Sequence, residues 1–331
     1  MKKVVITQVT RARVVTWSIR EAFYEPLMII WMNRKSRIGL LILVFYLLMA
    51  SIGPYLIPYD PKGNPLEIYQ PPSLKHPLGT DYMGRDVLAQ IVHGARDILL
   101  IAFFAASITV LVGAAVGITS GFVGGVTDVI LVNFTRLLMT IPSLPLIIVL
   151  SAFLRVADPL SIAMILSVTA WTGLALAVRA QVLALKNEEY IEAARTLGLT
   201  KFHIIFREIL PNIMSYVAIN FLTSMVSAIY ASSGLYFLGI LPFTAVNWGV
   251  MLNQAWRIGG GAALANPMYA PKTLHYILAP IMAIIGLQVG LILLTFAIDE
   301  IFNPRLRTEY IKKLESPRGK KEPQKKERDQ F

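Results

Sequence analysis

Six long intervals of the chain contain no Asp, Glu, Lys or Arg, and this pattern dominates the sequence. Each interval is apolar and can hold one helix of roughly 20 residues, the length that crosses the hydrocarbon of a bilayer. A membrane β-barrel would instead show alternating segments of about ten residues. The pattern therefore predicts an all-α membrane protein. The intervals are 38–59, 98–127, 137–154, 159–178, 209–256 and 273–298.

The interval 209–256 is long enough for two spans, and we interpret it as one. Residues 213–237 are apolar enough to cross a membrane. The stretch that follows, "LGILPFTAVNWGVMLNQAW", carries Pro242 and several amide side chains, which suit a loop or a re-entrant segment better. The sequence thus predicts six transmembrane helices, an even number that leaves both termini on one side.

Basic residues support this count. With both termini in the cytoplasm, the inner segments carry 23 Lys and Arg residues and the outer segments carry seven, as expected because these residues gather on the cytoplasmic side. The last one, Arg136, lies inside the third span and either reaches the inner surface or faces an aqueous path. The net charge of +11 reflects this topology, and we expect no nucleic-acid partner, because the basic residues are not interleaved with aromatic stacking platforms.

This topology predicts the organisation of the chain from end to end. The tail is expected to be disordered, with attraction to anionic membrane lipid as a sharper alternative. The predicted segments are a cytoplasmic basic arm with an interfacial helix (1–37), the first transmembrane helix (38–57), an external segment (58–97), a five-helix core (98–300) with a cytoplasmic loop at 183–213 and an external loop at 238–273, and a basic cytoplasmic tail (301–331).

Small and kink-forming residues mark two of the spans. Gly113, Gly117 and Gly121 recur every four residues in the second span, so they share one helix face, where another helix can approach closely. The third span contains "TIPSLP", in which Pro142 and Pro145 remove backbone donors and predict a kink.

One polar stripe runs along the fifth span. Asn220, Ser224 and Ser227 recur at i, i+4 and i+7, with Thr223 beside them. A polar stripe on an apolar helix must face protein or water and not lipid. The stripe therefore either packs against neighbouring helices or lines a translocation cavity.

The charged stretch "EEYIEAARTLGLTKFHIIFREILPN", residues 188–212, predicts two short amphipathic helices on the cytoplasmic side. Gly198 is suited to end the first helix, because the residue after a helix often adopts a positive φ. Thr200 can cap the second helix, and Pro211 is expected to stop it.

Each of the two helices has an apolar face of its own. Such helices either insert into a groove on a partner protein or lie on the membrane surface. The apolar positions are Tyr190, Ala194 and Leu197 in the first helix, and Phe202, Ile205, Phe206 and Ile209 in the second.

The spacing of this stretch resembles the EAA loop of permease subunits of ABC importers. The positions that match are Glu192, Ala193, Ala194, Gly198, Leu210 and Pro211. Other segments resemble the dipeptide/oligopeptide/nickel branch of these permeases, and the similarity covers about residues 33–307. They are "HPLGTDYMGRDVLAQIVHGAR" (76–96), "GITSGFVGGVTD" (117–128), "LYFLGI" followed by "NWGVML", and "NPRL" (303–306).

The resemblance implies the type I importer permease fold, a multi-pass protein of the inner (cytoplasmic) membrane. It implies that the loop 183–213 docks in a cleft of a cytoplasmic ATPase subunit, with the six matching positions as the ATPase-coupling residues. It also implies an external solute-binding protein and a related, non-identical second permease subunit. Peptides are the substrate class that the branch suggests, with oligosaccharides and nickel as alternatives.

The sequence offers no chemistry of its own, so we expect no catalytic residue, cofactor or metal site. It contains no G-x-x-x-x-G-K-[ST], G-x-S-x-G or H-E-x-x-H motif and no cysteine, and its four histidines are scattered. Asp81 and Asp86 suit turn capping better than cation binding. Two other functions stay open, a secondary transporter driven by an ion gradient and a membrane enzyme or anchor.

Overall fold

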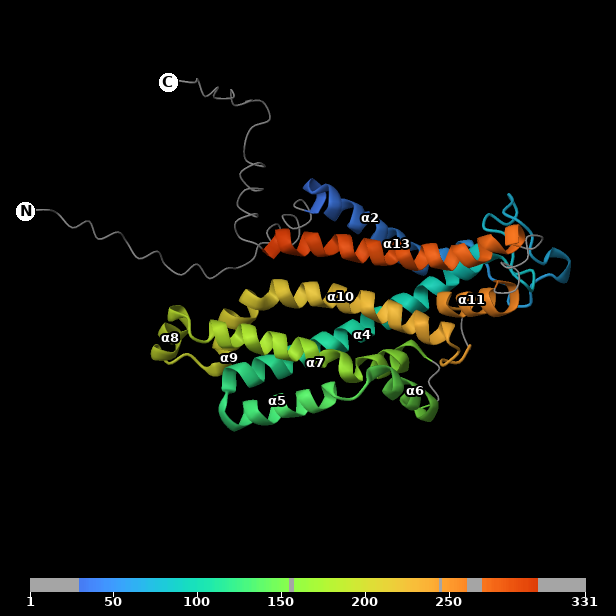
Figure 1. Ribbon diagram of the computed structural model, residues 1–331. Helices are drawn as coiled ribbons and strands as arrows, with labels where there is room; N and C mark the ends of the chain where they lie inside the picture. The colour runs from blue at the N-terminus through green and yellow to red at the C-terminus, as the bar shows by residue number, and fades with distance from the viewer. Residues whose placement is uncertain (1–29, 155–157, 244–245, 261–269, 303–331) are drawn as a thin grey trace, which may run out of the picture.

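The computed structural model describes residues 30–154, 158–243, 246–260 and 270–302 (Figure 1). Most of the predicted basic arm, all but two residues of the predicted tail and the segment 303–306 lie outside these ranges. Within them the regular secondary structure is helical, apart from one isolated bridge between Thr80 and Asp86 in the largely irregular segment 57–86.

The long helices run side by side along an elongated bundle, with α8 at one end and α11 at the other (Figure 1). The long helices are α2 (Arg34–Ser51), α4 (Val87–Val123), α7 (Pro159–Leu185), α10 (Leu210–Phe237) and α13 (Ala270–Phe302). The shorter elements are α3 (Gly53–Leu56), η2 (Pro65–Glu67), α5 (Gly125–Met139), α6 (Ser143–Leu154), α8 (Glu189–Thr196), α9 (Lys201–His203), α11 (Trp248–Gln254) and the π-helical turns η3 (Ile204–Ile209) and η4 (Ala255–Gly260).

Among the described residues, four helices are long and apolar enough to cross a membrane, and α5 with α6 would make a fifth span. The sequence predicts six spans, and the one that is missing from this count is the first, which corresponds to α2. Its 18 residues begin with three cations, and Pro54 follows soon after, so its own apolar run is short. The bend of 84° between α5 and α6 falls in "TIPSLP", where the prolines predict a kink. The four helices are Val87–Val123, Pro159–Leu185, Lys201–Phe237 and Thr273–Ile298.

Helix α4 extends well beyond the apolar interval 98–127. It begins at Val87, because the Asp86 side chain accepts a hydrogen bond from the Ala89 N–H at 2.9 Å and caps the helix. Its 37 residues give a length of about 55 Å, against about 30 Å for the hydrocarbon of a bilayer. The helix is therefore longer than one crossing of the hydrocarbon requires, and its first turns carry the end of the segment 58–97.

The glycine face predicted in the second span forms the seam between α4 and α7. A Cβ atom on Gly117 would lie 2.6 Å from the carbonyl oxygen of Ala175 and 2.8 Å from the Cβ of Val178. One turn further on, a Cβ on Gly121 would meet Val182 at 2.9 Å. The absence of side chains at these positions lets the two helices approach closely.

Gly117→Ala should destabilise the protein by about 1–3 kcal/mol, because the new methyl group overpacks this seam. Gly173→Ala on α7 is the matched control, since a Cβ there meets no atom within 4 Å, and it should gain about 0.5–1 kcal/mol of helix stability. The midpoint of thermal unfolding in detergent measures both. Equal midpoints for the two variants would contradict the close contact.

Candidate functional site

Helix α8 divides the residues of its motif between two faces. Ile191 and Ala194 are buried, whereas Glu192 and Ala193 are exposed. Tyr190 and Leu197, the other apolar positions that the sequence places on one face with Ala194, are 41% and 78% exposed in this chain. Ile191 takes their place, since residues three apart lie on one helix face.

The buried face of α8 belongs to a hydrophobic cluster that it shares with η3 and with the ends of three long helices. Ile191 and Ala194 belong to one hydrophobic cluster with Phe122 of α4 and Val182 of α7. Ile213, in the first turn of α10, completes the contact. The short helix is therefore attached to α4, α7 and α10 together.

Two polar contacts add to this attachment. The guanidinium carbon of Arg195 lies 5.5 Å from the ring centroid of Phe122, a cation–π geometry. The amide of Asn212 donates a hydrogen bond to the Tyr190 hydroxyl at 3.3 Å, which joins α8 to α10. Burial, with repulsion from Glu188 and Glu208, raises the pKa of Tyr190.

Gly198 ends α8 as predicted. Its φ is +76°, and the Gly198 N–H donates to the Arg195 carbonyl at 2.9 Å while the Leu199 N–H donates to the Ala194 carbonyl at 3.1 Å. These two bonds form a Schellman motif. A Cβ on Gly198 would meet no atom within 4 Å, so the glycine is required by backbone conformation and not by crowding within this chain.

The second predicted helix starts as expected and ends differently. The Thr200 hydroxyl accepts a hydrogen bond from the His203 N–H at 3.2 Å and caps it. Pro211 does not stop it, because the helix runs from Lys201 to Phe237 without a break. The π-helical turn η3 explains this. It ends at Ile209, two residues before Pro211, and such a wider turn relieves the clash between a proline ring and the preceding carbonyls.

An apolar patch is exposed at this end of the bundle. Leu197 is 78% exposed, Phe202 is 70% exposed and Phe206 is 51% exposed. The two phenylalanine rings stack with their centroids 4.3 Å apart. The predicted apolar stripe of this helix is therefore divided, because Ile209 is fully buried. We call Leu197, Phe202 and Phe206 the inner-end patch, and such exposed patches mark interaction sites.

An ion pair that the sequence did not reveal holds α5 to α7 at the end of the bundle that carries α8. The Nε and Nη2 atoms of Arg179 each donate to one carboxylate oxygen of Asp128 at 2.6 Å. This is the bidentate geometry that arginine forms with carboxylates. Asp128 directly follows the charge-free interval 98–127, and Arg179 directly follows the interval 159–178. These positions at the ends of two predicted spans were the one signal in the sequence that the two charges could meet.

A cavity of about 280 Å³ between α4, α6, α7 and α10 contains part of the predicted polar stripe. Ser224 and Ser227 line it, whereas Asn220 and Thr223 do not. The amide of Asn220 donates to the Tyr216 carbonyl at 2.8 Å, within its own helix. Three more hydroxyls, which the sequence analysis did not place in a polar stripe, complete the polar lining: Thr109, Ser143 and Thr169.

The external segment is organised around the buried Asp81. Its carboxylate accepts hydrogen bonds from the Met83 and Arg85 N–H groups, from Arg85 Nε at 2.7 Å and from the Gln90 amide at 2.9 Å. Nearby, the Lys75 ammonium holds the pKa of Glu67 below its usual range. The capping interpretation of Asp81 and Asp86 is confirmed, and the described residues contain no group that could hold a metal ion.

Comparison with known proteins decides the family of this fold. Residues 113–308 match the family model of the binding-protein-dependent transport system inner membrane component. Residues 31–72 match the N-terminal TM domain of oligopeptide transport permease C. The chain belongs to the binding-protein-dependent transport permeases.

Individual relatives agree with this family. The permease is 39% identical to the dipeptide transport system permease protein DppC of Bacillus subtilis, over 67% of this chain and 70% of the relative. It is 36% identical to the oligopeptide transport system permease protein OppC of the same organism, over 67% of this chain and 73% of the relative. The OppC of Haemophilus influenzae is 32% identical, over 67% and 72%.

Membership of the family fixes the general role of the protein. It is the transmembrane permease subunit of an ABC importer in the inner membrane, and not the ATPase. A system of this kind includes an ATPase and a solute-binding protein as separate partners. The ion-gradient transporter and the membrane enzyme are therefore no longer alternatives.

The two adjacent alanines of α8 should respond differently to the same substitution. Ala194→Leu should destabilise the permease by about 1–3 kcal/mol, because the larger side chain overpacks the cluster with Phe122. Ala193→Leu, on the exposed face, should stay within about 0.5 kcal/mol of the wild type. Thermal unfolding of the two purified variants tests this, and a larger loss for Ala193→Leu would contradict the assigned faces.

Proposed function

We propose that this permease forms half of a path for di- or oligopeptides delivered by an external solute-binding protein. The names of the DppC and OppC relatives support a peptide substrate, as does the match to the N-terminal domain of oligopeptide transport permease C. Oligosaccharides and nickel, carried in other lineages of the branch, are the alternatives. A related second permease subunit would form the other half of the path.

The proposed topology has six spans, with α2 as the first and both termini in the cytoplasm. Three observations support it. The 84° bend joins α5 and α6 into one broken span. The cations Arg34, Lys35 and Arg37 stand at the start of α2, as expected for its cytoplasmic end. The loop with α8 and the external segment with α11 lie at opposite ends of the bundle (Figure 1).

The loop 183–213 is proposed to couple ATP hydrolysis on the separate ATPase to transport. The observation that carries this proposal is the two-sided character of α8. One face is buried in a cluster shared with α4, α7 and α10, and the other presents Glu192 and Ala193, while the inner-end patch is exposed at the end of α8 and on the helix that follows. A partner that grips the exposed face therefore moves three long helices. Of the other matching positions, Gly198 fixes the shape of the loop, and Leu210 with Pro211 connects it to α10.

Substitutions on the exposed face test this coupling. Ala193→Trp and Glu192→Arg should each weaken ATPase association by at least about tenfold, because residues at the centre of an interface contribute most of its affinity. Co-purification of the ATPase from membranes measures the effect. Leu66→Trp is the matched control, since it adds similar bulk at an exposed position of the external segment. Unchanged ATPase recovery in both loop variants would exclude the docking role.

The cavity that Ser224 and Ser227 line is proposed as part of the translocation path. Its five hydroxyls come from four helices, and hydroxyls can exchange hydrogen bonds with passing peptide amides in either direction. Of the four residues in the predicted polar stripe, the proposal therefore assigns only Ser224 and Ser227 to the path, because Asn220 and Thr223 lie outside this lining.

Ser227→Phe should reduce the uptake of a labelled dipeptide or oligopeptide into intact cells by about tenfold or more, because the ring fills the cavity. ATPase recovery should not change. Thr295→Phe on α13, outside the cavity lining, is the control and should leave uptake intact. Uptake of nickel or an oligosaccharide in place of peptides would overturn the substrate assignment, whereas normal uptake by Ser227→Phe would overturn only the path.

A further inference from the structure

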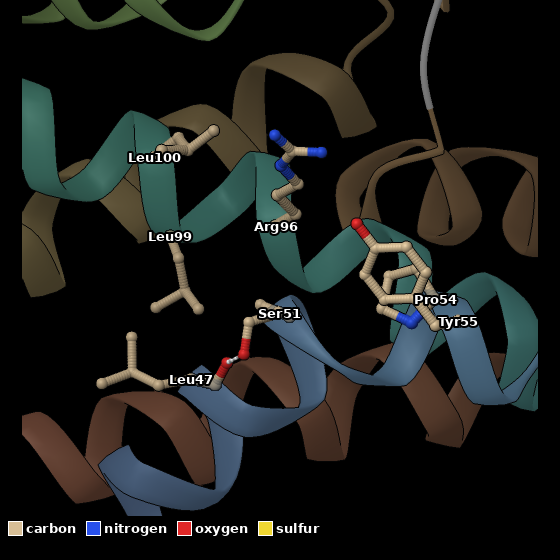
Figure 2. Close-up of a pocket in the computed structure, with 8 residues that line it drawn as sticks. Leu47, Ser51, Pro54, Tyr55, Arg96, Leu99 and Leu100 are labelled. Atoms are coloured by element: carbon tan, nitrogen blue, oxygen red, sulfur yellow. Dashed lines mark hydrogen bonds between the residues drawn. The ribbon is translucent and has the colours of Figure 1, made fainter.

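An apolar groove opens between α2, α3 and α4 on the side of the bundle that carries the external segment. Its volume is about 390 Å³. Figure 2 shows Leu47, Leu99 and Leu100 at one end and Arg96 and Tyr55 at the other. The groove thus has one apolar end and one polar, positively charged end.

Contacts within the protein fix the outer end of this groove. A Cβ atom on Gly53 would lie 2.5 Å from a methyl carbon of Val92, so α3 and α4 touch there because residue 53 is a glycine. Next to this contact, His93 Nε2 lies 2.9 Å from the Ile57 carbonyl oxygen. The groove is therefore built into the fold and is not the result of a loosely placed loop.

Arg96 is an exposed cation without a close partner in the described part of the chain. It forms no hydrogen bond or ion pair there, and its neighbour Asp97 acts on it only through space. The Ser51 hydroxyl is not a hydrogen-bond partner of Arg96 either, because it donates a hydrogen bond to the Leu47 carbonyl at 2.7 Å. A guanidinium beside apolar side chains is stabilised by an anion, and a phosphate can accept two of its N–H groups at once.

The position of the groove across the membrane indicates that the phosphate of a lipid head group is the anion within reach of Arg96. Arg96 stands directly before the charge-free interval 98–127, and Tyr55, 88% exposed, has the position of an aromatic residue at the membrane surface. Leu99 and Leu100 belong to this interval, and Leu47 belongs to the charge-free interval 38–59. The polar end of the groove therefore faces lipid head groups, and its apolar end faces acyl chains.

We propose that this groove is a binding site for one anionic phospholipid. Arg96 binds the phosphodiester, and one acyl chain lies along Leu47, Ala50 and Leu99. The inference uses the proposed topology only to place Arg96 at the outer surface of the membrane. The groove would bind the lipid equally well if the permease had the opposite orientation in the membrane. Its failure is thus separate from a failure of the transport proposal.

Native mass spectrometry of the complete transporter, with phosphatidylglycerol titrated into the detergent solution, tests the site. Arg96→Gln should weaken the retention of one lipid molecule by about tenfold, as expected for loss of a charge-assisted contact. Ala50→Phe, which fills the apolar end and keeps Arg96, should also lose this lipid. Lys62→Gln removes an exposed external cation outside the groove and should retain it.

Equal retention by Arg96→Gln and the wild type would overturn the proposal, and so would an equal loss in the Lys62→Gln control. Thermal unfolding without added lipid, together with ATPase recovery, confirms that each variant is folded and assembled.

Since the chain contains no cysteine, Ser51→Cys also places a single reactive group in the groove of this subunit. A photoreactive probe attached there should cross-link to lipid in native membranes. Cross-linking to a second permease subunit or to another polypeptide would show that the groove is a protein interface and would overturn the proposal.

Discussion

The structure depends on the burial of Ile191 and Ala194 against the inner ends of α4, α7 and α10. A helix of eight residues is too short to be stable by itself in water, so tertiary contacts must hold α8 in place. Those contacts use one face only. The other face is free to carry the positions that a partner can recognise. The same burial thus stabilises the loop and links it mechanically to the membrane helices.

The close seam between α4 and α7 has a related role. Gly117 and Gly121 let the backbone of α4 contact the side chains of Val178 and Val182 on α7. The Asp128–Arg179 ion pair then joins α5 to α7. Within the lipid no hydrophobic effect drives helices together, so close packing and polar contacts between helices must hold them. The helices that meet α8 are therefore joined to one another as well as to the loop.

The sequence predicted the features that depend on local chemistry. Charge-free intervals located the spanning helices, Gly198 and Thr200 marked the ends of the loop helices, and the spaced glycines identified a packing face. It failed where the outcome depends on tertiary contacts. Nothing local says that Ile191 rather than Tyr190 faces the bundle, because both lie on possible apolar faces. Pro211 was expected to stop a helix, since the π-helical turn before it has no clear signature in sequence.

The cavity illustrates the same limit. Ser224 and Ser227 could be found because they belong to one polar stripe on one helix, whereas Thr109 and Thr169 lie on two other helices, α4 and α7. Only the fold brings them together. The Asp128–Arg179 pair likewise joins residues 51 positions apart, and no periodicity in the sequence connects them.

The length of α4 gives the protein a rigid connection between two compartments. Its first turn is capped by Asp86, next to the network around Asp81, and near its last turn Phe122 lies beneath Arg195 of α8. No proline interrupts the 37 residues between these points. Helix α4 is therefore one continuous rod between the network around Asp81 and the loop that carries α8, so a tilt or rotation at one end is transmitted to the other.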